Sequence, residues 1–147
     1  MKRNKMPFIS VGAFLLLCVF ATHAEAQSFI LSKVADLNTP IPSGSGNFDC
    51  FYNPVISGSN IAFEGYGLSN QEGIYLFDGF ALTKVADRNT PIPGGIGNFT
   101  NVFYPVISGS NVAFWAQGGG IYLFKNNTLI KLADPTLWID KRKAILI

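Results

Sequence analysis

Carboxylates are the side chains of this sequence that could carry out catalysis without a cofactor. Glu64, Glu72 and Asp78 lie close together in the first half of the chain. Two carboxyl groups can hydrolyse a glycosidic bond when one protonates the leaving group and the other attacks or activates water. Their counterparts in a second copy of the repeat described below are Trp115, Gly119 and Lys125. Because the second copy lacks these acids, we expect surface carboxylates and no enzyme, with a carboxylate-based hydrolase as the alternative.

Histidine is missing from the part of the chain that we expect to fold. The single histidine, His23, lies in an N-terminal segment that we predict to be removed. Ser-His-Asp and Cys-His nucleophiles, histidine acid–base catalysis and most zinc sites depend on this residue. We therefore expect no catalytic centre of these kinds and no cofactor.

Oxygen-bearing side chains of the kind that bind calcium occur in a loop of both copies. They are Asp36, Asn38, Asn47 and Asp49, of which the first three recur as Asp87, Asn89 and Asn98. Asp49 is replaced by Thr100 in the second copy, and the spacing fits no EF-hand. We predict a structural loop in which Asp and Asn satisfy backbone groups, with a calcium site at Asp36, Asn38, Asp87 and Asn89 as the alternative.

Residues that differ between the copies are better candidates for a binding site, because the shared residues are needed for the fold. Trp115 stands where the first copy has Glu64, and Tyr66 stands where the second copy has Gln117. The first copy also carries an insert at residues 68–71. Tyr66, Trp115 and Glu64 are the predicted ligand-contacting residues, with the two aromatic rings as a platform. Ordinary packing between sheets accounts for the same rings and is the stronger alternative.

The first 26 residues have a different character from the rest of the chain. Residues 2–5 contain three cations, residues 8–20 are apolar, and residues 24–26 read AEA. This is the layout of a secretory signal peptide, and the apolar run is shorter than the ~20 residues of a membrane-spanning helix. We predict a signal peptide at 1–26 and a secreted or periplasmic protein. The alternatives are an uncleaved anchor and a lipoprotein site at Cys18, although the residue before Cys18 is not small.

Loss of this segment changes the charge of the chain. The full chain has a formal charge of +2, and removal of three cations and Glu25 leaves eight basic and eight acidic residues. A neutral surface offers no field for nucleic acid, and no membrane attachment is expected after cleavage. Cys50 is then the only cysteine, so no intramolecular disulfide is expected.

The remaining chain is built from a repeat. Residues 31–67 align with residues 82–118 at an offset of 51, with 24 of 37 positions identical. After the insert the offset becomes 47, and a third copy opens at Leu129 with LIKLAD. We predict a β-repeat domain at 27–134 and a tail at 135–147. The repeats within that domain are bounded at 31–81, 82–128 and 129–134.

Short apolar runs between Gly, Asn and Pro residues indicate strands and turns. The predicted strands are 55–57, 61–63, 74–77 and 80–86 in the first copy and 103–108, 111–116, 121–124 and 128–133 in the second. Residues 28–36 are predicted as one extra strand. Asp78-Gly79 and Asn126-Asn127 are predicted as two-residue hairpin turns. No helix is expected after residue 26.

The run from Pro105 to Asp134, PVISGSNVAFWAQGGGIYLFKNNTLIKLAD, resembles the blade repeat of TolB-like (PD40/WD40-like) β-propellers. The matching residues are Pro105, Ser108, Ala113, Phe114, Ile121 and Tyr122, together with their counterparts in the first copy. The first turn departs from that family, because Gly-Ser-Asn replaces its Asp-Gly. The KVADxNTPIPxGxGNF segments instead resemble repeats of a family of exported bacterial proteins of unknown function. The resemblance implies an all-β fold of two four-stranded antiparallel blades plus one extra strand, an incomplete β-propeller.

A closed propeller needs about four or more blades, and this chain provides two. A truncated product of a longer propeller, a ring of several chains and a β-sandwich are all compatible with that number. The function that we favour is a non-catalytic binding module for an unknown protein or glycan, with homo-oligomers as a further expectation. The alternatives are a fragment without independent function and the hydrolase above. The resemblance informs the fold more than the function, because propellers host many unrelated functions.

Overall fold

The computed structural model describes residues 30–117 and 120–133. The predicted signal peptide at 1–26 and the tail at 135–147 lie outside these ranges. All the strands of the described residues belong to one compact unit, which begins at Lys33. Within the described ranges no helix is long and apolar enough to span a membrane.

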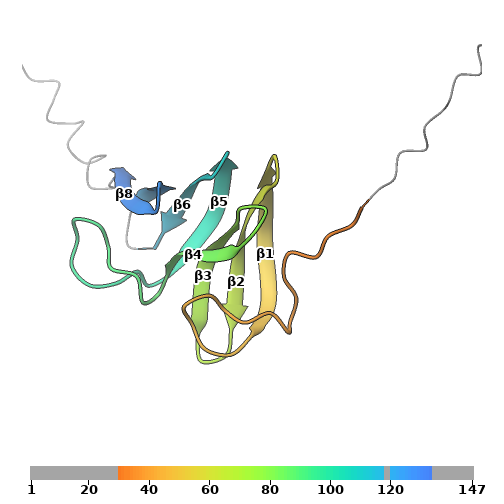
Figure 1. Ribbon diagram of the computed structural model, residues 1–147. Coiled ribbons are helices and arrows are strands. Elements are labelled where there is room, and N and C mark those ends of the chain that lie inside the picture. The colour runs from red at the N-terminus through yellow and green to blue at the C-terminus, as the bar shows by residue number, and fades with distance from the viewer. Residues whose placement is uncertain (1–29, 118–119, 134–147) are drawn as a thin grey trace, which may run out of the picture. The chain divides into compact units, whose positions relative to one another are not determined.

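This compact unit contains two four-stranded antiparallel sheets, each with its strands in sequence order (Figure 1). Sheet 1 consists of β1 (Phe48–Ser57), β2 (Asn60–Gly67), β3 (Gln71–Phe77) and β4 (Leu82–Asp87). Sheet 2 consists of β5 (Val102–Ser108), β6 (Asn111–Ala116), β7 (Ile121–Lys125) and β8 (Thr128–Ala133). The prediction of an all-β fold with two four-stranded antiparallel sheets is confirmed.

Sheet 1 buries apolar side chains on both of its faces. On one face of sheet 1, Phe63 and Tyr75 pack with Phe48 and Ile41 from the preceding loop. We call this the back face. On the front face Ala62, Ile74 and Leu76 pack in one cluster with Phe114 and Tyr122 of sheet 2 and with Phe99 from the loop before β5. Those three are the sequence counterparts of Phe48, Phe63 and Tyr75, so the front face of sheet 1 meets the back face of sheet 2.

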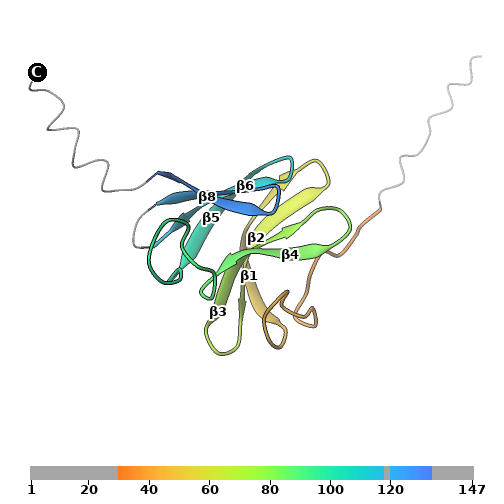
Figure 2. The same cartoon turned by 60° about the vertical axis from the view of Figure 1, so that its left-hand side comes forward.

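β5 is the strand of sheet 2 that lies against sheet 1, where it contacts β1, β2 and β3 (Figure 2). Both β1 and β5 contain a bulge, at Tyr52/Val55 and Phe103/Val106. Each bulge contains a proline, which has no amide hydrogen for the ladder and is tolerated at such irregular positions. The predicted start of the first strand at residue 55 was therefore too late, because β1 continues through the bulge to Phe48.

The prediction of a two-residue turn at Asp78-Gly79 is wrong. Strand pairing ends at Phe77↔Leu82, which leaves a four-residue loop. Asp78 Oδ1 accepts hydrogen bonds from the amides of Phe80 (2.9 Å) and Ala81 (2.8 Å), and these bonds hold the wider loop. The Asn126-Asn127 turn is confirmed, because Lys125 pairs with Thr128 and both asparagines have positive φ, at 50° and 56°.

The predicted extra strand at 28–36 is not formed in its described part, residues 30–36. The same pattern, LSKVAD, forms β4 as LTKVAD and most of β8 as LIKLA. The difference lies in the partner, since β4 pairs with β3 and β8 pairs with β7. Val34 and Ala35 still pack against the cluster on the back face of sheet 1. Burial of the apolar residues is thus kept where the hydrogen-bonded ladder is absent.

Phe114 and Trp115 are neighbours on β6 that provide a test of this packing. Phe114 is 2% exposed in the cluster between the sheets, whereas Trp115 is 41% exposed on the opposite face. We expect Phe114→Ala to lower the free energy of unfolding by about 3–5 kcal/mol, because it opens a cavity in a closed core. Trp115→Ala serves as the control and should cost less than half as much. Urea denaturation followed by circular dichroism measures both values, and equal losses would contradict the stacking described above.

Candidate functional site

Two glutamates lie buried on the front face of sheet 1, where it meets β5. Glu64 on β2 and Glu72 on β3 are 3% and 8% exposed. Tyr66 lies directly opposite Glu72 in the ladder, so the three side chains share one face of the sheet. The prediction that these acids are surface carboxylates is wrong for both glutamates. Burial of a carboxylate is costly unless its oxygens are hydrogen-bonded, so their partners decide what this cluster can do.

Glu64 connects the two sheets. Its Oε1 accepts hydrogen bonds from Asn53 Nδ2 (2.8 Å) and from the amide of Tyr104 (2.6 Å). Its Oε2 accepts a longer bond from the hydroxyl of Tyr66 at 3.5 Å. Tyr104 lies in the bulge of β5 with a positive φ of 55°, and its amide is directed at Glu64 rather than at a neighbouring strand. Both carboxylate oxygens therefore have partners, and the bond from Oε1 to the Tyr104 amide holds β5 against sheet 1.

Glu72 forms the second link between the sheets. Its Oε2 lies 3.5 Å from the guanidinium of Arg88, and its Oε1 accepts a 3.4 Å bond from the amide of Val102. Burial raises the pKa of Glu72, while the Arg88 charge and the Val102 amide oppose the rise. Arg88 also donates to Asn101, whose side-chain amide donates to Gln117. In the described part of the chain Arg88 Nε is buried without a hydrogen-bond partner, so this network is not fully satisfied.

Asp78 is not part of this cluster, because its carboxylate is occupied by the β3–β4 loop. The backbone amides of Ala81 and Phe80 lower the pKa of Asp78 below its ordinary value. Of the three acids considered from the sequence, the structure brings together Glu64 and Glu72 only. Each of these two bonds to a β5 amide, which gives them a structural role in joining the sheets.

The predicted aromatic platform is divided between two ring pairs. Tyr66 packs edge-on against Tyr52, with ring centroids 5.4 Å apart. Trp115 stacks on Phe103, with centroids 5.5 Å apart and an interplanar angle of 23°. The first pair belongs to sheet 1 and the second to sheet 2. The prediction that these residues contact a ligand stays a prediction, and the two rings belong to separate surfaces.

Sheet 2 has an exposed apolar face that the sequence did not single out. It comprises Val106, Trp115, Ile121, Ile130 and Leu132, which are all exposed. We call this front face of sheet 2 the open face. Strand pairing places Trp115 opposite both Phe103 and Ile121, and Leu123 opposite Ile130. Three of the equivalent positions of sheet 1 are buried, namely Glu64, Ile74 and Val85; Ile74, the counterpart of Ile121, is 0% exposed against 46%.

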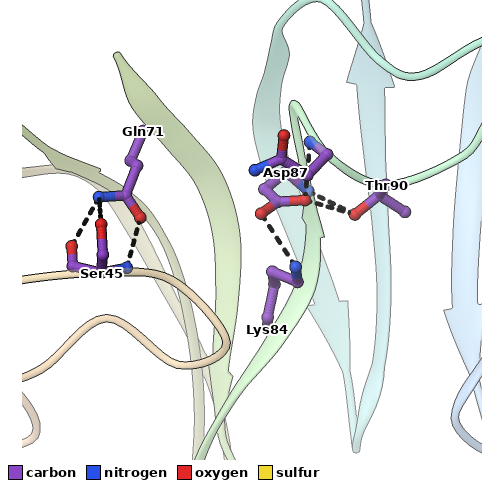
Figure 3. Close-up of polar contacts among 6 residues, drawn as sticks. Ser45, Gln71, Lys84, Asp87 and Thr90 are labelled. Atoms are coloured by element: carbon purple, nitrogen blue, oxygen red, sulfur yellow. Dashed lines mark hydrogen bonds and ion pairs between the residues drawn. The ribbon is translucent and has the colours of Figure 1, made fainter. Parts of the chain in front are cut away.

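The repeated loops use their aspartates to hold turns. Asp87 Oδ1 accepts hydrogen bonds from Thr90 Oγ1 (2.6 Å) and the amide of Asn89 (3.1 Å), and Lys84 Nζ lies 2.9 Å from Oδ2 (Figure 3). Asp36 makes the same three contacts with Thr39, Asn38 and Lys33. Lys33, together with Thr39, lowers the pKa of Asp36 to about 2. These contacts match the predicted structural loop, and the described residues contain no group of three or more His, Cys, Asp or Glu side chains placed to hold a metal ion.

The insert in the first copy has a structural role that sequence comparison missed. Gln71 Oε1 accepts a bond from the amide of Ser45 (2.9 Å), and Gln71 Nε2 donates to the carbonyl of Ser45 (2.6 Å), as Figure 3 shows. The same nitrogen donates to the carbonyl of Leu68 at 3.2 Å. The insert therefore fastens the loop before β1 to the start of β3. The sequence signal for this role was that the insert occurs in only one of the two copies.

Cys50 is a partly buried free thiol in β1. Burial raises its pKa, and the neighbouring Asp49 acts in the same direction. A thiol that holds its proton is a weak nucleophile, so this environment does not activate Cys50 for catalysis.

Comparisons with known proteins supply no relative for this site. No family model, no curated protein and no solved structure matches the chain. The resemblance to TolB-like blades therefore rests on the sequence motifs alone, and the function must be argued from the geometry.

The titration of Tyr66 tests whether this side chain lies beside the two buried glutamates. Burial, together with the charges of Glu72 and Glu64, raises the pKa of Tyr66 to about 12. Tyrosine in an unfolded chain titrates near pH ~10, so the stability that Tyr66 contributes is present below about pH 10 and is lost as the pH rises toward 12. We expect Tyr66→Phe to remove one late-titrating phenol from the ultraviolet titration and to flatten the alkaline loss of stability. The chain unfolded in urea serves as the control, and an unchanged titration would contradict the placement of Tyr66 beside the glutamates.

Two experiments on the loop aspartates distinguish a structural role from calcium binding. We expect a chelator to leave the thermal midpoint unchanged, because the oxygens of Asp36 and Asp87 already have protein partners. We expect Asp87→Asn to lower the free energy of unfolding by about 1–3 kcal/mol through loss of charge-assisted hydrogen bonds. Differential scanning calorimetry measures both effects, and a midpoint that falls with chelator and recovers with added Ca²⁺ would favour the calcium site.

Proposed function

We propose that this chain is an exported β-propeller-type repeat protein that acts as a non-catalytic interaction module and binds through the open face of sheet 2. The observation that carries the proposal is the difference in exposure between two equivalent sheet faces. In sheet 1 Glu64, Ile74 and Val85 are buried on the front face, whereas their counterparts Trp115, Ile121 and Leu132 in sheet 2 are exposed.

The residues of the open face are suited to a covered surface. Ile121 has the same residue type as its buried counterpart Ile74, and Leu132 replaces the buried Val85 with a larger apolar side chain. An exposed apolar patch with an aromatic residue is the usual character of an interaction surface. Trp115, stacked on Phe103, provides a rigid aromatic anchor of the kind enriched among the residues that dominate binding energies.

The buried acids favour binding over hydrolysis. Glu64 and Glu72 bond to backbone amides of β5, and those bonds join the sheets. The open face carries Trp115 at the position of Glu64, so it lacks that acid. An aromatic ring surrounded by aliphatic residues suits the apolar surface of a protein or the face of a sugar ring.

The blade-type fold is supported by how the sheets pack. Each sheet is a four-stranded antiparallel meander, and the front face of one meets the back face of the next. Repeated sheets that each contact only their neighbours are the arrangement of propellers and other repeat architectures. Export is supported by the signal-like character of residues 1–26.

Trp115→Ser tests the binding surface. We expect the substitution to weaken binding to protein or glycan by about tenfold or more, since loss of an aromatic anchor commonly costs at least ~1.4 kcal/mol. Phe80→Ser is a matched control, because Phe80 is 95% exposed in the β3–β4 loop and lies outside the open face. Arrays of glycans and peptides, together with a measurement of self-association, provide the readout. Equal binding by wild type and the Trp115 variant, or no binding of any kind, would contradict the proposal.

A further inference from the structure

We propose that the occupant of the open face is a second copy of this chain, which binds through the back of its first repeat. This inference rests on the proposed function and names its partner. The contact between copies would repeat the contact that already joins sheet 1 to sheet 2 within one chain.

The contact within the chain is front to back. Its sheet 1 side contains Glu64, Glu72 and Ile74, and its sheet 2 side contains Arg88 and the amides of β5. A front-to-back contact uses two different surfaces, so each copy keeps one unused surface of each kind. These are the open face and the counterpart surface, which we define as Leu37, Phe51 and Gly58. The counterpart surface aligns with Arg88, Val102 and Gly109 of the internal contact.

Charged groups of the internal contact are replaced by apolar residues on both unused surfaces. Within the chain Glu64 and Glu72 lie on the sheet 1 side, and Glu72 lies 3.5 Å from Arg88 on the sheet 2 side. The counterpart of Glu64 on the open face is Trp115, and that of Arg88 on the counterpart surface is Leu37, which is 58% exposed. A contact between copies would therefore bury neither an unpaired acid nor an unpaired base, either of which would be strongly destabilising. A partner unrelated to this chain gives no reason for the two replacements to occur together.

One hydrogen bond of the internal contact can also form between two copies of the chain. The amide of Gly109 donates to Ser57 Oγ at 2.9 Å and joins the β5–β6 turn to the end of β1. Both residues are identical in the two copies, so Ser108 on one chain and Gly58 on another could make the same bond. Ser108 and Gly58 are both exposed within a single chain.

The contact requires one rearrangement. Within the chain, Val85 and Ala86 of β4 belong to the cluster that covers the back face of sheet 2. In the first repeat Val34 and Ala35 pack against the back face of sheet 1 without forming a strand. On association, Leu132 and Ala133 of a neighbouring β8 would take the place of that unpaired segment. With two sheets per copy, rings of about four to eight sheets correspond to two to four copies.

Substitutions that introduce a charge into each of the two surfaces test this inference. We expect the mass of the purified protein, measured by sedimentation velocity over a range of concentrations, to rise from one copy to two to four. Leu37→Arg and Trp115→Glu should each raise the dissociation constant by about tenfold or more, because each places an unpaired charge in the contact. Phe80→Ser should leave the association unchanged, and the urea midpoint of each variant checks that it folds.

The outcomes separate this inference from the function on which it rests. A protein that stays monomeric at every concentration, or a Leu37→Arg variant that associates like wild type, would overturn the second copy as the occupant. If such a protein still binds a glycan or peptide and loses that binding with Trp115→Ser, the open face remains the binding surface and its occupant is a different molecule.

Discussion

The arrangement of both sheets depends on the hydrogen bond between the Glu64 carboxylate and the amide of Tyr104. The amide is available because β5 bulges at this point, where Tyr104 adopts a left-handed backbone conformation. That conformation costs about 1–2 kcal/mol for a residue other than glycine. A hydrogen bond to a charged group contributes about 1.5–3 kcal/mol and offsets this cost. A local irregularity in one strand thus becomes the point at which the second sheet is held.

The two copies show how one sequence pattern acquires different environments. The front face of sheet 1 is covered by sheet 2, and its acids are paired with groups of β5 and the preceding loop. The front face of sheet 2 is exposed, and Trp115 stands there at the position of Glu64. Replacement of buried ionic groups by apolar ones is tolerated, and often stabilising, when both partners of a pair change together. The differences between the copies therefore follow the surfaces that each copy presents.

Most strands could be predicted from the sequence, because β-branched and aromatic runs were separated by Gly and Asn. The errors occurred where contacts from another element decide the outcome. Asp78-Gly79 has the composition of a tight turn, but the Asp78 side chain bonds to two amides and widens the loop. Residues 31–36 have the composition of a strand and form none, because no strand edge pairs with them in the described part of the chain.

The candidate site was harder to predict than the fold. Glu64 and Trp115 were identified because they differ between the copies, but the sequence could not show that one is buried and the other exposed. Arg88 was missed, although its difference from Leu37 provides the same kind of signal. Burial of Glu72 beside Arg88 depends on how one sheet stacks on the next, and no spacing within a single repeat contains that information.

The front-to-back stacking also bears on how such a chain can change in length. A duplicated repeat brings with it both halves of the contact that it needs, so it can be inserted between two existing repeats without a new interface. The residues on the two outer surfaces of this pair of repeats do not take part in the internal contact, so they can change without weakening it. Leu37 and Trp115 lie on those two outer surfaces, whereas Arg88 and Glu64 lie on the inner ones. The polar residues that a repeat has lost to apolar ones therefore indicate which of its surfaces face another repeat of the same chain.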